Sequence, residues 1–443
     1  MLKKIIFKLL CMLTVTSTAF VGCGSSEDTA QQAITEVSNK KADSMVENET
    51  SDETLRLVNM KVEIDAALKS YAKVYEEQTG IKVEIESIGG GTDMNSVLKG
   101  YLAADNMPDI FAFGGAGDYN TWKDQMTDLS TEAWTEDTDV EFIGDDSKVV
   151  GFPYAIEGYG ITYNKDLLDK AGIDPASLTS YSAYEEAFAK LDGMKEELGI
   201  DAVVSMAASI AGGMTWSTGG HNFGSFVSTG VKQGDTSIID ALNAGVVPDR
   251  ARLDQYAKFV DLLFDYSDEY VLISGSYDDQ LALWEDQKAV FIHQGNWIDP
   301  NLISDGITFN VGIAPSAFLE EETDGILADA PSWWGIYNGS NKIQQAKDFL
   351  TAIATTEEGA KALVLDAGMI SPFKSVTISP TAPLAKDLQK WVLAEKIYPW
   401  HYTRLPEGFG SNELGPIYEL LATGSIDATM FADMVEVAVS ELQ

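Results

Sequence analysis

The chain has 443 residues and a formal net charge of −39, because 69 acidic side chains outnumber 30 basic ones. It is too long for one hydrophobic core, so two domains or lobes are expected, and a hydrophobic content of 45% favours a packed globular body over disorder. Such an acidic surface repels phosphate backbones and anionic lipid headgroups, which argues against a nucleic-acid-binding protein.

The first residues have the pattern of a processing signal. Three lysines precede an apolar run, residues 9–20, that is too short to span a bilayer. The run leads into "FVGCGSS", in which a glycine precedes Cys23. This stretch resembles a bacterial lipoprotein lipobox, although Phe20 stands where leucine is common. The resemblance implies that residues 1–22 are a signal peptide and that Cys23 is lipidated; the alternative is an ordinary signal peptide that contains a cysteine.

Residues 23–54 are expected to form a disordered tether between the lipid and the globular body. The segment is rich in acidic and small polar residues, so it cannot bury enough apolar surface to offset its ordering entropy. Cys11 and Cys23 are the only cysteines, so removal of the signal leaves no pair for an internal disulfide. These features favour a lipid-anchored protein on the extracellular face of the cell membrane, in a Gram-positive bacterium.

The globular body begins with strands that alternate with helices. "TLRLVNMKV" predicts a strand, and apolar residues at helical spacing from 64 to 75 predict a helix that stops at Gly80. "IKVEIES" alternates apolar and charged residues, as a strand does. A short helix over residues 93–104 and a strand in "PDIFAFGG" follow. This order predicts an α/β body with a parallel sheet, whose ligands bind at the carboxyl ends of the strands.

The middle of the chain is richer in helix. Apolar stripes predict helices over residues 184–191, 256–264 and 346–353, and Ser182 with Glu185 matches a capping box at the start of the first. These stripes are expected to form core rather than a functional surface.

Motifs for catalysis, metal binding and cofactor binding are missing. None of the three histidines, His221, His293 and His401, has a second ligand at metal-site spacing. Neither the nucleophile elbow nor the phosphate-binding loop occurs. We therefore expect no catalytic residue, no metal and no cofactor.

Tryptophans lie at breaks in the predicted structure. The residues concerned are Trp216, Trp297, Trp333, Trp334 and Trp400. Each is flanked by Gly, Pro or polar residues; in "AVFIHQGNWIDP", Trp297 follows an apolar strand rather than lying within it. An indole offers a flat apolar face and one N–H donor, which suits the C–H faces and hydroxyls of a sugar. Packing under a loop is the alternative for each one, but several together favour a lined cleft.

Four passages carry a resemblance to a known family. They are "YEEQTGIKVEIE", "AADNMPDIFAF", "GFPYAIEGYGITYNKDLLDKAGID" and "WEDQKAVFIHQGNWID". The chain resembles the extracellular solute-binding proteins of ABC importers, in the sugar-binding branch that includes maltose-binding protein. The third passage is the most specific. In the fourth, Phe291 stands where methionine is common.

The resemblance implies a fold and a function. The fold is a two-lobed α/β periplasmic-binding-protein-like (type II) fold with a hinge and an interlobe ligand cleft. Lobe 1 would comprise residues 55–156 and 313–370, and lobe 2 residues 157–312 and 371–443. Such a protein captures a carbohydrate, here expected to be an oligosaccharide, and delivers it as a monomer to the permease subunits of an ABC importer.

The resemblance also assigns candidate ligand-binding residues. Glu157 stands where the family has a carboxylate that binds sugar hydroxyls, and Trp297 and Trp400 stand at or near tryptophans that stack on the sugar. Asp118 is the counterpart of a sugar-binding aspartate, although Phe113 replaces the tryptophan that precedes it. The alternatives are a hinge salt bridge for Glu157 and a solvated loop acid for Asp118.

Tyr154 is a further candidate, because it could stack on the sugar or donate its hydroxyl, or else pack the hinge. Two other functions remain open. The same fold could bind a peptide or polyamine, and carboxylates beside tryptophans also build glycosidases.

Overall fold

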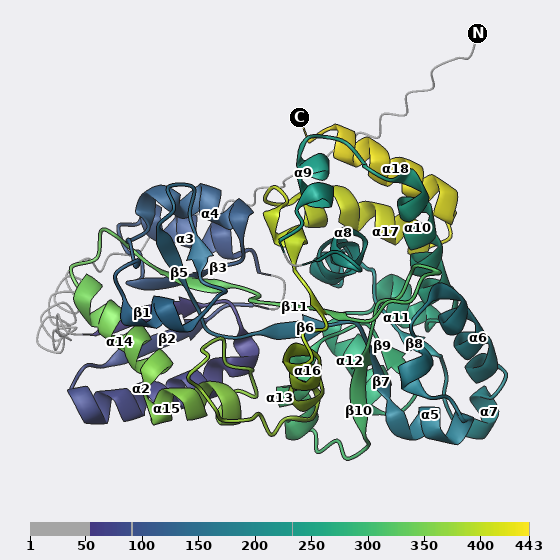
Figure 1. The fold of residues 1–443 in the computed structure, drawn as a ribbon, viewed down its shortest axis with the longest axis horizontal. Coiled ribbons are helices and arrows are strands. Elements are labelled where there is room, and N and C mark those ends of the chain that lie inside the picture. Colours follow the sequence, from purple (N-terminus) through teal and green to yellow (C-terminus); the bar gives the residue numbers. More distant parts are fainter. Residues whose placement is uncertain (1–53, 90–91, 233, 443) are drawn as a thin grey trace, which may run out of the picture. The chain divides into compact units, whose positions relative to one another are not determined.

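The computed structural model describes residues 54–89, 92–232 and 234–442 (Figure 1). The predicted signal peptide, the lipidation site Cys23 and all but the last residue of the predicted tether lie outside these ranges. In the described ranges, no helix has both the length and the apolar character that crossing a membrane requires.

The first lobe is built on a mixed sheet of six described strands in the order β2-β1-β3-β12-β5-β4. The strands are β1 Leu55–Asn59, β2 Val83–Ser87, β3 Ile110–Phe113, β4 Phe142–Ile143, β5 Val149–Pro153 and β12 Trp333–Ile336. The pairs β1–β2 and β1–β3 are parallel, as the sequence predicts. The other half of the sheet is antiparallel, because β12 arrives from a distant part of the chain and inserts between β3 and β5.

Helices cover this sheet with their apolar faces. They are α2 Asp65–Thr79, α3 Met94–Ala103, α4 Ala116–Trp122, α14 Ile343–Thr355 and α15 Glu357–Lys361. The buried stripe of α2 includes Tyr71 and Tyr75, whose rings pack on Phe349 of α14. Gly80 ends α2 in the left-handed conformation at φ 78°, which glycine adopts without a Cβ clash.

The second lobe is built on a sheet of four described strands in the order β10-β7-β9-β8. These are β7 Ile161–Asn164, β8 Val204–Ser205, β9 Phe291–Ile292 and β10 Val311–Ala314. The helices of the remaining chain are α5 Lys165–Ala171, α6 Tyr181–Asp192, α7 Lys195–Leu198, α8 Phe223–Ser228, α9 Ser237–Asn243, α10 Arg250–Asp265, α11 Glu269–Ser274, α12 Tyr277–Glu285, α13 Asp299–Ser304, α16 Pro383–Leu393, α17 Gly415–Ala422 and α18 Ala428–Ser440. Most of the apolar stripe of α10 is buried in one core cluster with α6, α17 and α18.

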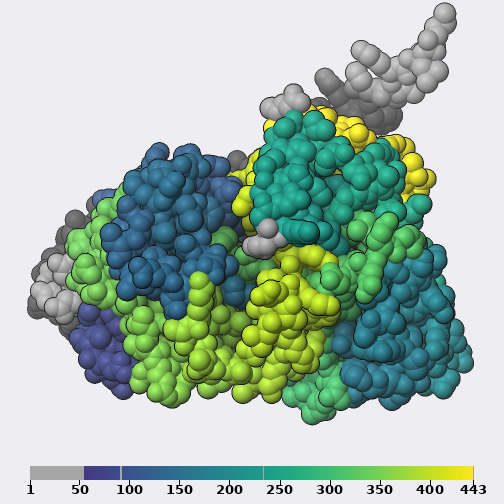
Figure 2. Space-filling model, viewed as in Figure 1, coloured from purple at the N-terminus to yellow at the C-terminus, as the bar shows by residue number. Residues whose placement is uncertain are grey.

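A small third sheet joins the two lobes. Its strands are β6 Glu157–Tyr159, β11 Ile326–Asp329 and β13 Ile397–Tyr398, in the order β13-β11-β6. β6 lies three residues after β5 of the first sheet and one residue before β7 of the second, and β11 leads after three residues into β12. Figure 1 shows β6 and β11 between the two larger sheets, and Figure 2 shows yellow-green residues between the blue and teal surfaces.

Two local predictions are wrong. Helix α6 begins after Ser180, whose hydroxyl accepts the Ala183 N–H, rather than at a capping box of Ser182 and Glu185. Ser182 instead donates its hydroxyl to Glu320, so it is not available as a cap. The strand expected over residues 289–292 comprises only Phe291–Ile292, although Ala289 and Val290 are fully buried as well.

Candidate functional site

Trp297 lies at the centre of an aromatic cluster. The cluster comprises Tyr159, Trp216, His221, Trp297, Trp400 and Tyr402. The ring centroid of Trp297 lies 4.7 Å from that of His221, 6.1 Å from that of Tyr159 and 6.3 Å from that of Trp400. Four distant segments therefore supply one group of rings, and three of the predicted tryptophans belong to it.

The backbone around Trp297 fits closely against β6. Trp297 lies on a short 3-10 helix, η6 Asn296–Ile298, directly after Gly295. A Cβ at Gly295 would lie 2.4 Å from both the Trp297 ring and the Gly158 carbonyl oxygen. The Gly158 N–H donates to Asn296 Oδ1 at 2.9 Å. A glycine before Trp297 thus lets the indole fold back over its own backbone beside the joining sheet.

A close approach of two π-helical segments positions Trp216 and His221. These residues lie on η5 Trp216–Asn222, which packs on η9 Phe409–Leu414. A Cβ at Gly219 would lie 1.8 Å from the carbonyl oxygen of Gly410, so only glycine fits there. π-helical turns are rare and often occur at functional sites, and here one carries two rings of the cluster.

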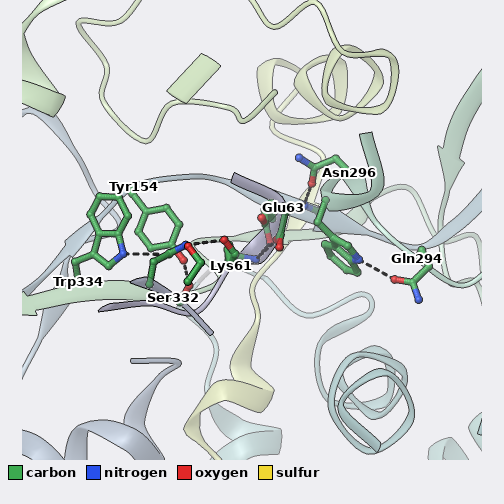
Figure 3. A network of polar contacts seen from close by, with 12 residues as sticks. Lys61, Glu63, Tyr154, Gln294, Asn296, Ser332 and Trp334 are labelled. Carbon is green, nitrogen blue, oxygen red and sulfur yellow. Dashed lines mark hydrogen bonds and ion pairs between the residues drawn. The ribbon is translucent and has the colours of Figure 1, made fainter. Parts of the chain in front are cut away.

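A buried ion pair borders the joining sheet. Lys61, just past the end of β1, places its Nζ 2.7 Å from Glu157 Oε2 and 3.5 Å from Glu63 Oε1 (Figure 3). Glu157 is only 1% exposed. Burial raises the pKa of Glu157, and the Lys61 charge opposes that rise. Burial disfavours the Lys61 ammonium, but Glu157 and Glu63 hold its pKa above the usual value. The salt bridge considered for Glu157 is therefore present, with Lys61 as its partner.

Several buried polar atoms at this place have no hydrogen-bond partner among the described residues. They are Glu157 Oε1, Tyr159 OH, His221 Nδ1, both ring nitrogens of His293, Asn296 Nδ2 and Trp400 Nε1. Buried polar groups of native proteins are nearly always paired with protein or with water, so water or a ligand supplies the partners at this place. The set contains donors, acceptors and groups that can be either, which matches the mixed character of hydroxyl groups.

The two adjacent histidines stay neutral near neutral pH. Burial lowers the pKa of His293 to about 4. Burial, with smaller contributions from His293 and Lys61, lowers the pKa of His221 well below its usual value. Neutral imidazoles can accept as well as donate hydrogen bonds. In the part of the chain that the structure describes, no three His, Cys, Asp or Glu side chains are grouped to hold a metal ion.

Trp334 and Tyr154 pack in the core of the first lobe rather than in the aromatic cluster. Their rings stack with centroids 4.3 Å apart, and both are 0% exposed. The Trp334 indole donates to Asn59, and the Tyr154 hydroxyl is hydrogen-bonded to Ser332 (Figure 3). Packing of Tyr154, one of the two alternatives, is therefore what the structure has. For Trp334 the predicted role is corrected, because core residues of the first sheet surround it.

Trp333 also lies away from the cluster, on the opposite face of β12. Its ring stacks on Phe113 and packs against Phe142, and its indole donates to the Val140 carbonyl oxygen at 2.7 Å. Trp333 is therefore not part of the aromatic cluster around Trp297, because successive residues of a strand point to opposite faces and its ring packs beside Phe113 and Phe142. Contact of Trp333 with a ligand stays a prediction.

Asp118 belongs to a second polar group, between the first lobe and residues 403–407. It accepts the Gly114 N–H at 2.6 Å and Asn95 Nδ2 at 2.7 Å, and burial raises its pKa. Asn95 Nδ2 also donates to Glu407 Oε1 at 2.9 Å, and Thr121 donates to Glu407 Oε2 at 2.8 Å. Asp118 is thus a structured, largely buried group rather than a solvated loop acid.

The polar group around Asp118 is connected to the aromatic cluster by residues 400–407. Thr403 and Glu407 follow Trp400 and Tyr402 of the cluster, and they pack on α4: a Cβ at Gly115 would lie 2.7 Å from the Thr403 carbonyl oxygen. One segment, residues 400–407, therefore contributes rings to the cluster and a carboxylate to the Asp118 group.

Sequence reasoning missed Lys61, Asn296 and the role of His221. Lys61 could have been found, because a lysine just past a buried strand needs a partner, and the candidate Glu157 was unpaired. His221 gave no local signal, since a π-helical turn cannot be read from spacing. A surface hollow lined by Arg56, Lys69 and Glu86 lies against the edge strand β2 and includes none of these residues.

Comparisons with known proteins identify the family of this chain. A family model described as bacterial extracellular solute-binding protein matches residues 70–392. The chain is 23% identical over 359 residues to the multiple sugar-binding protein of Streptococcus mutans, covering 78% of this chain and 81% of that protein. It is 30% identical over 199 residues to a maltooligosaccharide ABC transporter solute-binding lipoprotein of Streptococcus pneumoniae, covering 41% of this chain and 40% of that one.

Solved structures share the two-lobed fold. RafE in complex with raffinose aligns with a TM-score of 0.69 at 17% identity, over 88% of this chain and 99% of that one. A sugar transporter protein of Bacillus licheniformis in complex with stachyose aligns with a TM-score of 0.67 at 18% identity, over 88% and 100%. The predicted fold class is confirmed. Because the family model matches well over half of its length, the chain belongs to the bacterial extracellular solute-binding proteins, which bind solutes rather than catalyse reactions.

Proposed function

We propose that this protein captures an oligosaccharide against the aromatic cluster and delivers it to the permease of an ABC importer. One observation carries the proposal: Trp297 and its neighbouring rings are bordered by buried polar atoms that have no hydrogen-bond partner among the described residues, among them Glu157 Oε1 and Trp400 Nε1. Apolar faces edged by donors and acceptors match the surface of a sugar. The names of the relatives, which bind sugars, support the same ligand class.

The chemistry of binding follows from burial. Indole and phenol rings would cover the C–H faces of the sugar rings, while hydroxyls would satisfy the carboxylate, imidazole and amide groups. Glu157 needs such a partner, because one of its oxygens is buried without a hydrogen bond and an unpaired buried polar group is unfavourable. We place Trp216, Trp297 and Trp400 at the stacking surface, Glu157 beside it and Asp118 at its far end.

Delivery would depend on the anchor and on closure of the lobes. Cys23 would carry the lipid that holds the protein to the outer face of the membrane, with residues 23–54 as the tether. The ligand would shift an open–closed equilibrium of the two lobes, and the permease would recognise the closed monomer. The boundaries at residues 156, 313 and 370 stay a prediction; β10 spans residue 313 and pairs with β7 of the second lobe.

A thermal-shift screen tests the ligand class. Raffinose, stachyose and maltooligosaccharides would be compared with a peptide mixture and with spermidine. A ligand present at 100 times its Kd stabilises the folded state by about 2.7 kcal/mol, which is a readily measured rise in Tm. A rise with spermidine or peptide and none with any sugar would contradict the proposal. So would the release of shorter sugars from the incubated mixture, because that would indicate a glycosidase.

A matched pair of variants tests whether the sugar binds against Trp297. Trp297→Ala should weaken sugar binding by about 2 kcal/mol, roughly thirtyfold, as truncation of aromatic anchors does. Tyr270→Ala is the control, since Tyr270 is 67% exposed on α11 and lies outside the aromatic cluster of Trp297. Equal affinities of the two variants, measured by calorimetry on folded protein, would remove Trp297 from the site.

A further inference from the structure

A relay of buried hydrogen bonds runs from the Trp297 indole into the second lobe. Trp297 Nε1 donates to Gln294 Oε1 at 2.7 Å, and Gln294 Nε2 donates to Gln280 Oε1 at 2.8 Å. Gln280 Nε2 in turn donates to the backbone oxygen of Ser205 at 3.0 Å.

The direction of the relay is fixed by its two ends. An indole nitrogen can only donate, and a backbone carbonyl oxygen can only accept. Each glutamine amide must therefore present its oxygen toward Trp297 and its nitrogen toward Ser205. Turning either amide over would place two donors or two acceptors against each other in a site without water access, since Gln280 is 0% and Gln294 1% exposed. The relay has one satisfied arrangement.

The two glutamines are themselves held in place. Gln294 is fixed at its backbone, because Thr162 of β7 donates its hydroxyl to the Gln294 carbonyl oxygen at 2.9 Å. Gln280 lies on α12, and the Ser205 hydroxyl donates to its backbone oxygen at 2.6 Å. Ser205 belongs to β8, a strand of the second sheet. The far end of the relay is thus attached to regular structure.

The near end is a short turn that bridges to β6 through Gly295 and Tyr159. Trp297 lies on a 3-10 turn of three residues that follows a two-residue strand. The ring is 6% exposed and packs on the rings of Tyr159, His221 and Trp400. Packing limits the movement of the ring, and the relay gives its one polar atom, Nε1, a partner on the Gln294 side. A ring that is already oriented loses less freedom when a ligand stacks on it.

We propose that Gln280 is a positioning residue for ligand binding, because it fixes the plane of the Trp297 indole through Gln294. This rests on the proposed function in one respect, namely that the ligand stacks on Trp297. The relay assigns a binding role to a residue of α12 that acts only through two other side chains.

Indole N–H exchange tests the relay without any ligand. In protein labelled at the tryptophan nitrogens, the Trp297 resonance is the one that disappears in Trp297→Phe. Gln280→Met keeps the chain length but cannot accept from Gln294, and it should speed exchange of this proton at least tenfold. Gln344→Met, at an exposed position on α14, is the control and should leave the rate unchanged. An unchanged rate in Gln280→Met would overturn the inference.

A double-mutant cycle with raffinose as the probe separates positioning from general damage. In the native background Gln280→Met should lower raffinose affinity about tenfold; in the Trp297→Phe background, where no indole N–H exists, it should change affinity less than twofold. Equal effects in both backgrounds would show that Gln280 acts by another route and would overturn the inference.

Failure of the proposed function gives results that differ from failure of the inference about Gln280. If Trp297→Ala binds raffinose as the native protein does, while raffinose raises the Tm of both, the ligand does not stack on Trp297 and the binding role of Gln280 falls with it. If no sugar binds at all, the exchange measurement still decides whether Gln280 fixes the indole.

Discussion

Replacing Lys61 by methionine removes the ammonium that neutralises Glu157. The carboxylate would then be left 1% exposed, with Oε1 already lacking a partner and Oε2 deprived of its contact at 2.7 Å. Removing one partner of a buried ion pair destabilises a protein by about 3–5 kcal/mol, because an uncompensated charge stays behind. The Lys61 side chain is 14% exposed, so some solvent reaches the pair. We therefore expect the lower end, about 3 kcal/mol.

The opposite change should be milder. Glu157→Gln leaves Lys61 with Glu63 at 3.5 Å, so the ammonium keeps a counter-charge and the loss should be about 1–2 kcal/mol. The double variant K61M/E157Q has no charge at position 157 and should be more stable than K61M alone, although Glu63 loses its contact with Lys61. The free energy of unfolding of all three variants at pH 7 would be measured by urea titration.

Lys69→Met is the matched control. Lys69 pairs with Asp65 four residues earlier on the exposed face of α2, at 2.8 Å, and such pairs contribute about 0.3–0.5 kcal/mol. A loss in K61M no larger than in K69M would refute the reasoning. The pH dependence gives a second check. Since burial raises the pKa of Glu157, folded K61M takes up a proton before the unfolded chain does, so its deficit should shrink as the pH falls below 7.

Three further predictions concern the site. Burial lowers the pKa of His293 to about 4, so the unfolded chain binds the proton before the folded protein does. The free energy of unfolding, measured by urea titration at each pH, should therefore fall as the pH drops from about 6.5 to 4. His293→Gln should remove part of this pH dependence. Gly219→Ala should destabilise the protein by about 1–3 kcal/mol and weaken sugar binding, because the added Cβ would meet the backbone of Gly410. Gly220→Ala is the control: its Cβ would lie 3.8 Å from the nearest side chain, so sugar binding measured by calorimetry should be unchanged. Glu407→Ala should remove the hydrogen bonds of residues 403–407 to α3 and α4. The radius of gyration of the ligand-free protein, measured by X-ray scattering, should then rise. An unchanged radius would show that this contact does not hold the two lobes together.

Local pattern predicted the first half of the fold well. The strand Leu55–Asn59, the helix that stops at Gly80 and the strand Val83–Ser87 all follow from hydrophobic spacing and turn chemistry within a few residues. The insertion of β12 between β3 and β5 could not be predicted in this way. It joins segments that are far apart in the sequence, and no local signal states which strands pair.

The tryptophans show the same limit at the site. Trp297 and Trp334 both stand among glycines and polar residues, and nothing nearby in the sequence separates them. Their surroundings differ because Trp334 lies on a central strand, with Tyr154 stacked on it, whereas Trp297 lies on a turn beside the joining sheet. Sequence can propose such residues; tertiary packing decides among them.

The position of β12 late in the sequence also affects how the first sheet can form during folding. Until Trp333 and Trp334 are made, β3 and β5 have no strand between them, and the first sheet exists only as two fragments with open edges. About 180 residues separate β5 from β12, so the edges stay unpaired until that whole stretch of chain is available. Open strand edges invite pairing with other chains. Residues 55–153 therefore need protection from aggregation until Trp333 and Trp334 are available to pair with them.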